Sequence, residues 1–286
     1  MSISNKVVFI AGGSAGIGLS IAVELAKNNN TLCIIARDIK NLESAKATIE
    51  NSGNSKCIIR SADATDYNAL KPILENAVKE IGTPDIVINC VGRARPGHFQ
   101  NITAQMMQDT MQANFGSMWN VAHILVPYMK AKGGKIVNTS SIGGFLGIFG
   151  FTDYSASKFA IIGFSEALKQ ELSRFNISVQ VLCPPDTDTQ GLAIENQTKP
   201  EETKKISASA KLLQPEEVAK QAIRAMEGNS FMIIPGTDGK LTYWLKRHFP
   251  TIADWILNTI IKKVQKEKAL VYSTPSYQHK PSVAHI

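Results

Sequence analysis

A short apolar run that leads straight into a group of glycines constrains the fold of this chain most. Val7–Ala11 has no polar side chain, as expected for a parallel strand buried on both faces. Gly12, Gly16 and Gly18 follow at once, ahead of an apolar-rich helix expected over residues 19–27. Glycines there let the backbone turn tightly and approach a pyrophosphate at the helix N-terminus. The order of strand, glycines and helix therefore predicts a dinucleotide cofactor, although a tight turn alone would also explain the glycines.

Strand-like and helix-like stretches alternate along most of the chain. After the first pair, we expect strands over residues 31–36, 57–60, 85–90, 134–139, 177–182 and 231–234. We expect the intervening helices over residues 41–52, 67–81, 104–129, 155–175 and 215–228. This alternation predicts an α/β fold, a Rossmann-type doubly wound parallel sheet in a single domain over residues 1–237. Ligands of such sheets bind at the carboxyl ends of the strands.

The end of the second strand distinguishes between the two nicotinamide cofactors. An acidic residue there would bind the ribose 2′-hydroxyl of NAD, whereas an arginine would pair with the 2′-phosphate of NADP. The tip position falls on Arg37, and Asp38 lies one residue further, turned into the loop. We therefore predict NADPH/NADP+, with Arg37 and Ser14 around the phosphate. The alternative is that Arg37 is only a solvated surface charge.

A tyrosine and a lysine one helical turn apart supply candidate acid–base chemistry. Read as helix, the segment Tyr154–Lys158 places its two end residues on one face. The ammonium would favour the phenolate and lower the tyrosine pKa below its reference value of about 10. The hydroxyl of Ser141, further upstream, could hold a substrate oxygen against the tyrosine. A helix with a snorkelling lysine has the same spacing, so the pair is weak evidence on its own.

Asn114 falls near the middle of the helix expected over residues 104–129. A mid-helix asparagine is most often a surface residue or a hydrogen-bonded core residue. The local sequence Asn114–Ser117 suggests another role. Loosening of the helix there would free a backbone carbonyl to hold a water beside Lys158.

Six motifs in order make the chain resemble the short-chain dehydrogenase/reductase family over about residues 5–235. They are the three glycines 12, 16 and 18, the pair Asn89 and Gly92, and the single residues Asn114, Ser141, Tyr154 and Lys158. The resemblance implies hydride transfer between a nicotinamide and a carbonyl or alcohol. It implies that Tyr154 is the general acid/base and that Ser141 binds the substrate oxygen. It also implies that Lys158 lowers the tyrosine pKa and holds the nicotinamide ribose, and that Asn114 anchors a proton-relay water.

The expected cofactor site draws on several loops. Asp63 is placed to contact the adenine, and Thr189 the nicotinamide carboxamide. The full expected set is Gly12, Ser14, Ala15, Gly16, Ile17, Gly18, Arg37, Asp63, Ala64, Asn89, Gly92, Tyr154, Lys158, Pro184, Thr187 and Thr189.

Three stretches carry a narrower resemblance, to the 3-ketodihydrosphingosine reductases. They are residues 149–160, the loop Pro184–Gly191, and the run Glu195–Pro200. This likeness implies NADPH-dependent reduction of the 3-keto group of a long-chain sphingoid base to sphinganine. Another short-chain reductase, for a 3-oxoacyl chain, a steroid or a retinoid, is the alternative. A non-catalytic NADP-sensing scaffold is less favoured, because a binding protein would not need the tyrosine hydroxyl.

Residues 190–213 are expected to form a mobile lid over the site. Leu192 and Ile194 could line an acyl-chain groove together with Ser141 and Tyr154 as substrate contacts. The alternative for the two aliphatic residues is ordinary packing beneath a loop.

The segment over residues 238–268 is predicted to be an amphipathic helical extension, which Pro250 divides into two short helices. Between residues 241 and 264, aromatic and aliphatic side chains alternate with lysines and an arginine. That mixture suits peripheral contact with a membrane surface. The alternative is that the helices pack on the enzyme or on a partner subunit. We expect residues 269–286 to be a disordered tail.

Composition bounds the remaining possibilities. The net charge of +7 favours anionic partners. The sequence has no basic block interleaved with aromatics, the pattern that would predict nucleic-acid binding. The four cysteines are widely spaced and predict buried thiols rather than disulfides or a metal site. No signal peptide and no apolar run long enough to span a membrane is evident, so we expect a cytoplasmic protein, peripheral at most to a membrane. By analogy with the family, we expect a homodimer or homotetramer.

Overall fold

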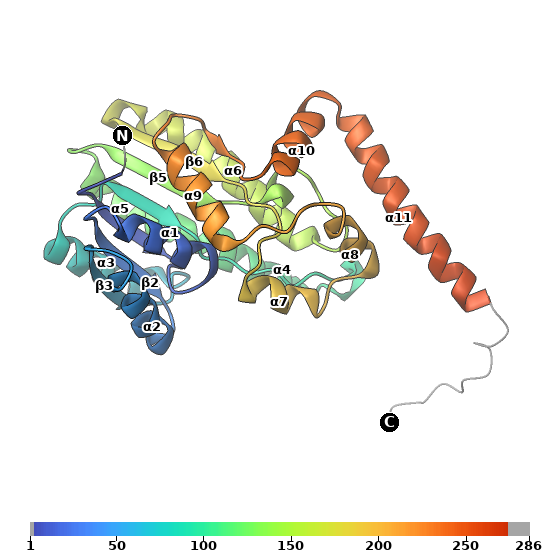
Figure 1. Ribbon diagram of the computed structural model, residues 1–286, viewed down its shortest axis with the longest axis horizontal. Helices are drawn as coiled ribbons and strands as arrows, with labels where there is room; N and C mark the ends of the chain where they lie inside the picture. The colour runs from blue at the N-terminus through green and yellow to red at the C-terminus, as the bar shows by residue number, and fades with distance from the viewer. Residues whose placement is uncertain (1–2, 274–286) are drawn as a thin grey trace.

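The apolar runs of the sequence become the strands of one parallel sheet, which confirms the predicted fold class (Figure 1). The computed structural model describes residues 3–273. The strand order is β3-β2-β1-β4-β5-β6-β7, and every pairing is parallel. The strands are β1 (Val7–Ala11), β2 (Thr31–Ala36), β3 (Lys56–Ser61), β4 (Ile86–Asn89), β5 (Gly134–Thr139), β6 (Ile177–Leu182) and β7 (Met232–Ile233).

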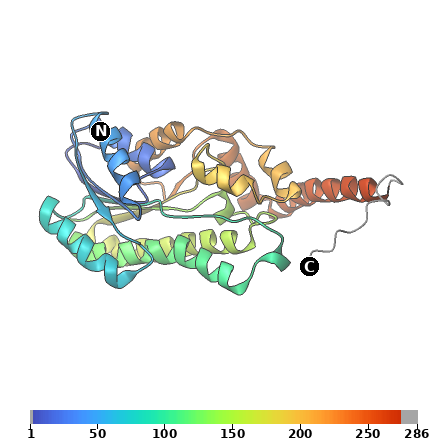
Figure 2. The same ribbon diagram turned by 90° about the horizontal axis from the view of Figure 1, so that it is seen from below.

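Helices cover both faces of this sheet, so its central strands are apolar on both sides (Figure 2). One layer contains α1 (Gly16–Ala26), α2 (Ile39–Glu50) and α9 (Pro215–Met226); the other contains α3 (Tyr67–Ile81), α5 (Ser117–Met129) and α6 (Thr152–Leu172). Strand β1 shows the alternation directly. Val8 and Ile10 pack with the first layer, while Phe9 and Ala11 pack with the second. Burial on both faces is why these runs lack the polar residues of a half-exposed strand.

The sheet reverses its strand order between β1 and β4, which opens a crevice at their carboxyl ends. The loops that follow these two strands touch there. Gly12 has a positive φ of 79°, and a Cβ on it would lie 2.7 Å from the backbone carbon of Cys90. Only glycine fits this approach, so the first glycine of the motif sets how closely the two loops meet.

The helix expected over residues 104–129 is interrupted where the sequence analysis predicted loosening. α4 (Ala104–Met111) runs into a π-helical turn, η2 (Gln112–Gly116), before α5 begins. Ser117 Oγ donates to the Ala113 carbonyl oxygen at 2.6 Å, a local hydrogen bond that competes with the regular ladder. Asn114 lies inside this turn.

α6 begins at Thr152 rather than at the expected Ser155, and it ends in the short 3-10 turn η4 (Ser173–Phe175). Asp153 lies in its first turn, where a carboxylate stabilises the helix dipole. The earlier start places Tyr154 within the helix. The remaining short 3-10 turns are η1 (Phe99–Asn101) and η3 (Ile142–Gly144).

Two short helices, α7 (Gln190–Asn196) and α8 (Glu201–Ser207), form most of the segment predicted as a lid. Beyond β7, Pro250 separates α10 (Thr237–His248) from α11 (Pro250–Ser273), as predicted. The prediction of two short helices is wrong for α11, which has 24 residues and passes residue 269, where we expected a tail to begin. Strong helix formers fill residues 265–270, and the next proline in the sequence is Pro275. Residues 274–286 of the predicted tail lie outside the described residues.

One face of α11 packs on the rest of the chain, in line with one of the two alternatives for this segment. Ala253 and Val264 are buried, and Lys268 Nζ pairs with the buried carboxylate of Glu202 on α8 at 3.0 Å. Across residues 3–273, the helices are all too short or too polar to cross a bilayer.

Candidate active site

Helix α6 brings Tyr154 and Lys158 together at the carboxyl edge of the sheet. The Lys158 side chain is buried, and its Nζ lies 5.6 Å from the centre of the Tyr154 ring. Lys158 Nζ donates a hydrogen bond to the backbone carbonyl of Thr139, at the end of β5, at 3.0 Å. The one-turn spacing predicted from the sequence therefore becomes a real proximity in the structure.

Ser141 reaches the same place from the end of β5. It precedes the turn η3, and its Oγ accepts a hydrogen bond from Gly143 N at 3.1 Å. Gly143 marks the space between the two hydroxyl-bearing residues. A Cβ built on it would lie 3.3 Å from Tyr154 Cε1 and 3.7 Å from Ser141 Oγ. A small residue at this position keeps both side chains accessible to a substrate oxygen.

Asn114 holds the π-turn against α6. Its Oδ1 accepts from Arg93 N at 2.8 Å, and its Nδ2 donates to Arg93 O at 3.0 Å and to Ser157 Oγ at 2.8 Å. Ser157 Oγ in turn donates to Tyr154 O at 2.6 Å. Ser157 was missed by the sequence analysis, and its position three residues after Tyr154 was the available signal. These contacts fix the backbone that carries the Tyr154 side chain.

Burial shifts the two central ionisable groups away from the charged forms. It lowers the pKa of Lys158 to about 8. Burial, and next the carboxylate of Glu195, raise the pKa of Tyr154, while the Ser141 hydroxyl acts in the opposite direction. The expectation of a tyrosine pKa below its reference value is therefore wrong for this structure, because burial and the Glu195 carboxylate outweigh any attraction from the ammonium. Lys158 is itself buried and donates its hydrogen bond to the Thr139 carbonyl.

The glycine loop after β1 is shaped for a phosphate group. A Cβ on Gly18 would lie 2.2 Å from Gly12 O, and a Cβ on Gly16 would lie 3.2 Å from Thr189 Cγ2. Within the described residues, no side chain caps the start of α1 after Ala15, so the backbone N–H groups of its first turn, from Gly16 and Ile17 onward, remain available to an anion. Thr189, from the loop beyond β6, thus faces the same crevice. These features fit a dinucleotide.

The outer end of the crevice carries Arg37 and Asp63. Arg37 is exposed, its backbone oxygen accepts from Ser61 Oγ, and Asp38 caps α2 by accepting from Asn41 N. Partial burial would raise the pKa of Asp63, but hydrogen bonds from Thr65 and the nearby Arg37 guanidinium bring it below its ordinary value. Within residues 3–273 the Arg37 side chain makes no hydrogen bond or ion pair, so its guanidinium is available to an anion.

Deeper in the crevice lie a buried polar side chain, Asn89, and a glycine, Gly92. Asn89 Nδ2 donates to Asn138 Oδ1 at 2.8 Å, but the buried Asn89 Oδ1 has no partner among residues 3–273. A Cβ on Gly92 would lie 3.3 Å from both Lys158 Nζ and Asn114 Oδ1. Ala64, in the loop after β3, is buried, and its carbonyl accepts a hydrogen bond from Asn120 Nδ2. An unpaired acceptor and a bare backbone beside Lys158 fit the ribose end of a nicotinamide nucleotide.

The loop after β6 contributes unequally to the site. Pro184 O accepts from Ile142 N at 3.2 Å, and Thr187 Oγ1 donates to Pro185 O at 2.9 Å, so the Thr187 hydroxyl turns back onto its own loop. On α7, Leu192 is buried whereas Ile194 is 54% exposed. These two predicted substrate contacts therefore differ in their access to solvent.

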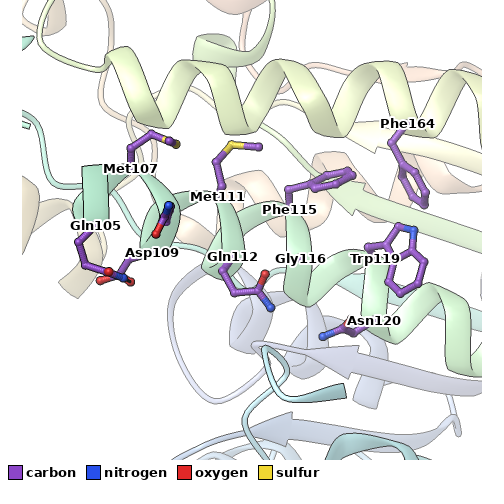
Figure 3. Close-up of a pocket in the computed structure, with 11 residues that line it drawn as sticks. Gln105, Met107, Asp109, Met111, Gln112, Phe115, Gly116, Trp119, Asn120 and Phe164 are labelled. Carbon is purple, nitrogen blue, oxygen red and sulfur yellow. Dashed lines mark hydrogen bonds between the residues drawn. The ribbon is translucent and has the colours of Figure 1, made fainter. Parts of the chain in front are cut away.

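A separate groove runs along α4, η2 and α5 and is closed on one side by Phe164 of α6 (Figure 3). Met107 and Trp119 lie on its exposed rim. None of the four predicted catalytic residues lines it. The acid–base chemistry therefore belongs to the crevice and not to this groove.

Comparison with known proteins agrees with this geometry. Residues 6–200 match the family model described as short chain dehydrogenase. The chain is 40% identical over 238 residues to the 3-ketodihydrosphingosine reductase of Mus musculus, covering 81% of this chain and 71% of that protein. It is 30% identical over 230 residues to a 3-oxoacyl-(acyl-carrier-protein) reductase of Chlamydia trachomatis, covering 80% of this chain and 93% of that protein.

Solved structures share the fold at lower identity. A short chain dehydrogenase/reductase from Burkholderia phymatum, in complex with NAD, superimposes with a TM-score of 0.77. The match covers 88% of this chain and 96% of that one at 20% identity. It supports the architecture alone.

The buried ammonium of Lys158 yields a prediction about stability. Its pKa falls from 10.5 to about 8 on folding, so the cost of burial is fully present below pH 8 and disappears as the pH rises towards 10.5. We expect Lys158→Met to raise the free energy of unfolding of the cofactor-free protein at pH 7, by up to about 3 kcal/mol less the lost bond to Thr139. Urea denaturation at pH 7 and pH 10 measures this gain, which should shrink at the higher pH.

The exposed Lys169 on the same helix is the matched control, and Lys169→Met should change the stability by less than about 0.5 kcal/mol. A Lys158→Met protein that is no more stable than wild type at pH 7, with the same difference at pH 10, would show that burial costs this lysine little.

Proposed function

The chain belongs to the short-chain dehydrogenase family, and we propose that it reduces the 3-keto group of 3-ketodihydrosphingosine to sphinganine with NADPH. Family membership makes it an oxidoreductase of CH–OH or ketone groups that uses a nicotinamide cofactor. The observation that carries the finer proposal is the 40% identity to the mouse 3-ketodihydrosphingosine reductase, which extends over 81% of the chain.

The crevice residues would hold the cofactor, whose reduced nicotinamide supplies the hydride. The glycine loop and the first turn of α1 would bind the pyrophosphate. Arg37 and Ser14 would bind the 2′-phosphate, Asn89 and Lys158 the nicotinamide ribose, and Thr189 the carboxamide. Asp63 and Ala64 would flank the adenine.

The acid–base residues would handle the proton. We assign to Ser141 the task of holding the ketone oxygen, and to Tyr154 that of donating its phenolic proton to that oxygen. A raised tyrosine pKa keeps the phenol protonated at neutral pH, as an acid requires. The Lys158 ammonium would stabilise the phenolate that remains. Asn114, in its π-turn, would hold the water that returns a proton to this group.

A second candidate is reduction of a 3-oxoacyl chain. The 30% identity to the chlamydial 3-oxoacyl reductase favours it, and the same four residues would perform the same chemistry. The two candidates differ in the substrate and not in the mechanism. A scaffold without activity is disfavoured, because it would leave the grouping of Ser141, Tyr154 and Lys158 without a purpose.

Tyr154→Phe tests the catalytic assignment. Removal of the phenolic hydroxyl should lower kcat for 3-ketodihydrosphingosine by at least about 100-fold, since the proton donor is lost. The Kd for NADPH should stay within about 3-fold of wild type, because the ring remains. NADPH oxidation and fluorescence titration measure the two quantities. The half-exposed Tyr128 of α5 provides the control, Tyr128→Phe, which should leave both unchanged. Surviving turnover in Tyr154→Phe would refute the assignment.

Arg37→Ala tests the cofactor. Loss of a charge-assisted contact to the 2′-phosphate should weaken NADPH binding by about 10- to 100-fold and NADH binding by less than about 3-fold. Titration of both cofactors into the variant measures the two effects. Lys40→Ala removes a nearby exposed cation and should change neither affinity. Equal weakening of both cofactors by Arg37→Ala would exclude the phosphate role.

We also propose that α10 and the outward face of α11 contact a membrane surface. Six apolar side chains there are exposed: Leu241, Trp244, Phe249, Ile252, Trp255 and Ile256. Basic residues accompany them, which suits an anionic lipid surface. A substrate with a long alkyl chain gives the enzyme a reason to work there.

Substitution of the exposed tryptophans tests the membrane contact without disturbing the packing on α8. Trp244→Ala with Trp255→Ala should lower partition onto vesicles containing anionic lipid by at least about 10-fold, because two large apolar side chains are lost. Sedimentation with vesicles measures it. Trp119→Ala, which removes an exposed tryptophan of α5, should have no effect. Equal partition of the wild-type protein, the double variant and the Trp119→Ala variant would refute the membrane contact.

A further inference from the structure

The first turn of α6, which carries Tyr154, is not fixed by its own sequence. Phe151 occupies the N-cap position, and a phenylalanine side chain has no oxygen that could accept from the free N–H groups of the turn. A helix start of this kind frays unless tertiary contacts hold it. Tyr154 is the third residue of α6, so its position depends on what packs against residues 149–151.

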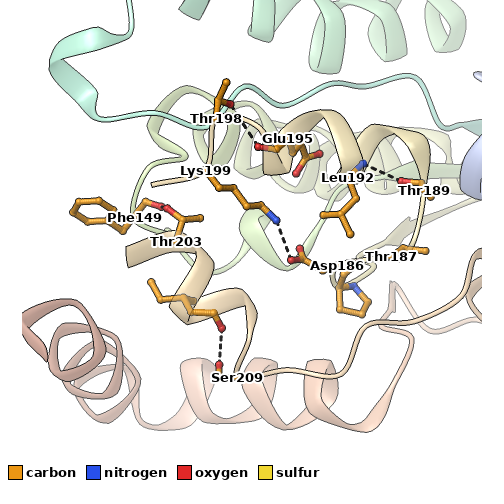
Figure 4. Close-up of polar contacts among 12 residues, drawn as sticks. Phe149, Asp186, Thr187, Thr189, Leu192, Glu195, Thr198, Lys199, Thr203 and Ser209 are labelled. Atoms are coloured by element: carbon orange, nitrogen blue, oxygen red, sulfur yellow. Dashed lines mark hydrogen bonds and ion pairs between the residues drawn. The ribbon is translucent and has the colours of Figure 1, made fainter. Parts of the chain in front are cut away.

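Helix α8 supplies that packing. Thr203 is fully buried, and its Oγ1 donates to the Phe149 carbonyl oxygen at 2.7 Å (Figure 4). The next residue, Gly150, has a positive φ of 80°, and a Cβ there would lie 2.6 Å from Thr203 Oγ1 and 3.0 Å from Pro200 Cγ. The backbone that leads into α6 therefore lies directly against α8, in a conformation and at a distance that favour glycine.

The same short segment contacts the tyrosine. The Phe151 ring is buried and lies against the Tyr154 ring, with the two centroids 5.2 Å apart. A hydrogen bond from Gly97 N to Gly150 O, at 2.8 Å, also ties the segment to the loop after β4. Residues 149–151 are thus held by two neighbours, and a shift of α8 would move the backbone that leads into Tyr154.

The position of α8 depends in turn on α11, which passes beside it (Figure 1). With seven residues, α8 is too short to be a stable helix on its own. The Glu202 side chain is 4% exposed, and its two carboxylate oxygens accept from Lys268 Nζ at 3.0 and 3.2 Å. A buried carboxylate is costly unless it is paired, so this ion pair fixes α8 to the C-terminal helix.

We propose that Thr203 and Glu202 are positioning residues through which α11 holds Tyr154 in place. The inference rests on the proposed function, because it concerns the residue that would donate the proton. An ion pair, a hydrogen bond and a ring contact connect α11 to Tyr154 without a break. A displacement of about 1 Å in a reacting group lowers a rate by up to about 100-fold, so contacts remote from the substrate can set kcat.

Thr203→Val removes the hydroxyl and keeps the shape of the side chain. In the full-length protein it should lower kcat for 3-ketodihydrosphingosine by about 10-fold or more, since Phe149 O loses its donor and the backbone before Tyr154 shifts. We express kcat per NADPH-binding site, counted by fluorescence titration, so that unfolded protein does not contribute. The Kd for NADPH should stay within about 3-fold of wild type, because the glycine loop is untouched.

Thr203→Ser keeps the hydroxyl and should restore kcat to within about 3-fold of wild type. Thr198→Val is the matched control, because Thr198 is an exposed threonine between α7 and α8, and it should leave kcat unchanged. A role of Thr203 in folding alone would lower the melting temperature of Thr203→Val and leave kcat per NADPH-binding site at the wild-type value. That result would overturn the inference.

Lys268→Met tests the α11 end of the connection, because it leaves the Glu202 carboxylate without its partner. It should lower kcat per NADPH-binding site by about 10-fold, and Lys268→Arg, which keeps the charge, should restore it to within about 3-fold. Lys266→Met alters an exposed lysine of the same helix and should have no effect. An unchanged kcat in Lys268→Met would overturn the inference.

A double variant shows whether both substitutions act through α8. Thr203→Val combined with Lys268→Met should lose no more than about 3-fold in kcat beyond the worse single variant. Losses that multiply would mean that the two residues act independently, and would overturn the inference.

Failure of the inference can be told apart from failure of the proposed function. Full turnover in Tyr154→Phe would overturn both. An inactive Tyr154→Phe beside a fully active Thr203→Val would overturn the inference and leave the proposed function standing. Wild-type turnover of another ketone only would overturn the proposed substrate, and the same losses in Thr203→Val and Lys268→Met are then expected on that ketone.

Discussion

One buried ammonium, that of Lys158, organises the site. A lysine held out of water costs free energy, and the drop of its pKa to about 8 reflects that cost. Its surroundings reduce this cost: the Thr139 carbonyl accepts one hydrogen bond, and Gly92 lacks the Cβ that would crowd Nζ. Asn114 and Ser157 fix the backbone around it. Packing and stability give no reason to bury a cation here. The reason is that Lys158 lies near Tyr154, where a negative charge would develop during the reaction.

Much of the fold could be predicted because its central strands are buried on both faces. The runs at residues 31–36, 134–139 and 177–182 begin and end in the structure as predicted, because the apolar residues at the centre of each run are buried. The start of α6 and the length of α11 were predicted less well. The first depends on how residues 149–152 pack against the lid helices, and the second on contacts such as Lys268 with Glu202. Contacts between distant segments leave no periodic signal in a sequence.

Some features of the candidate site could also be predicted from the sequence, and others could not. Motif order predicted that Asn114, Ser141, Tyr154 and Lys158 meet, and the topology of a doubly wound sheet brings their loops to one edge. The direction of the tyrosine pKa could not be predicted from the pair, because burial and the Glu195 charge outweigh a lysine that lies over the ring. Glu195 belongs to α7, far from the catalytic motif in sequence, so its influence on the tyrosine pKa has no signal in the motif spacing.

We propose that this crevice reduces a sphingoid ketone with NADPH. The most direct measurement is NADPH oxidation by the purified wild-type protein with 3-ketodihydrosphingosine, beside a 3-oxoacyl thioester and a steroid ketone. We expect turnover concentrated on the sphingoid ketone, with sphinganine as the product. Turnover confined to one of the other ketones would contradict it, and would reduce the likeness to 3-ketodihydrosphingosine reductases to shared ancestry.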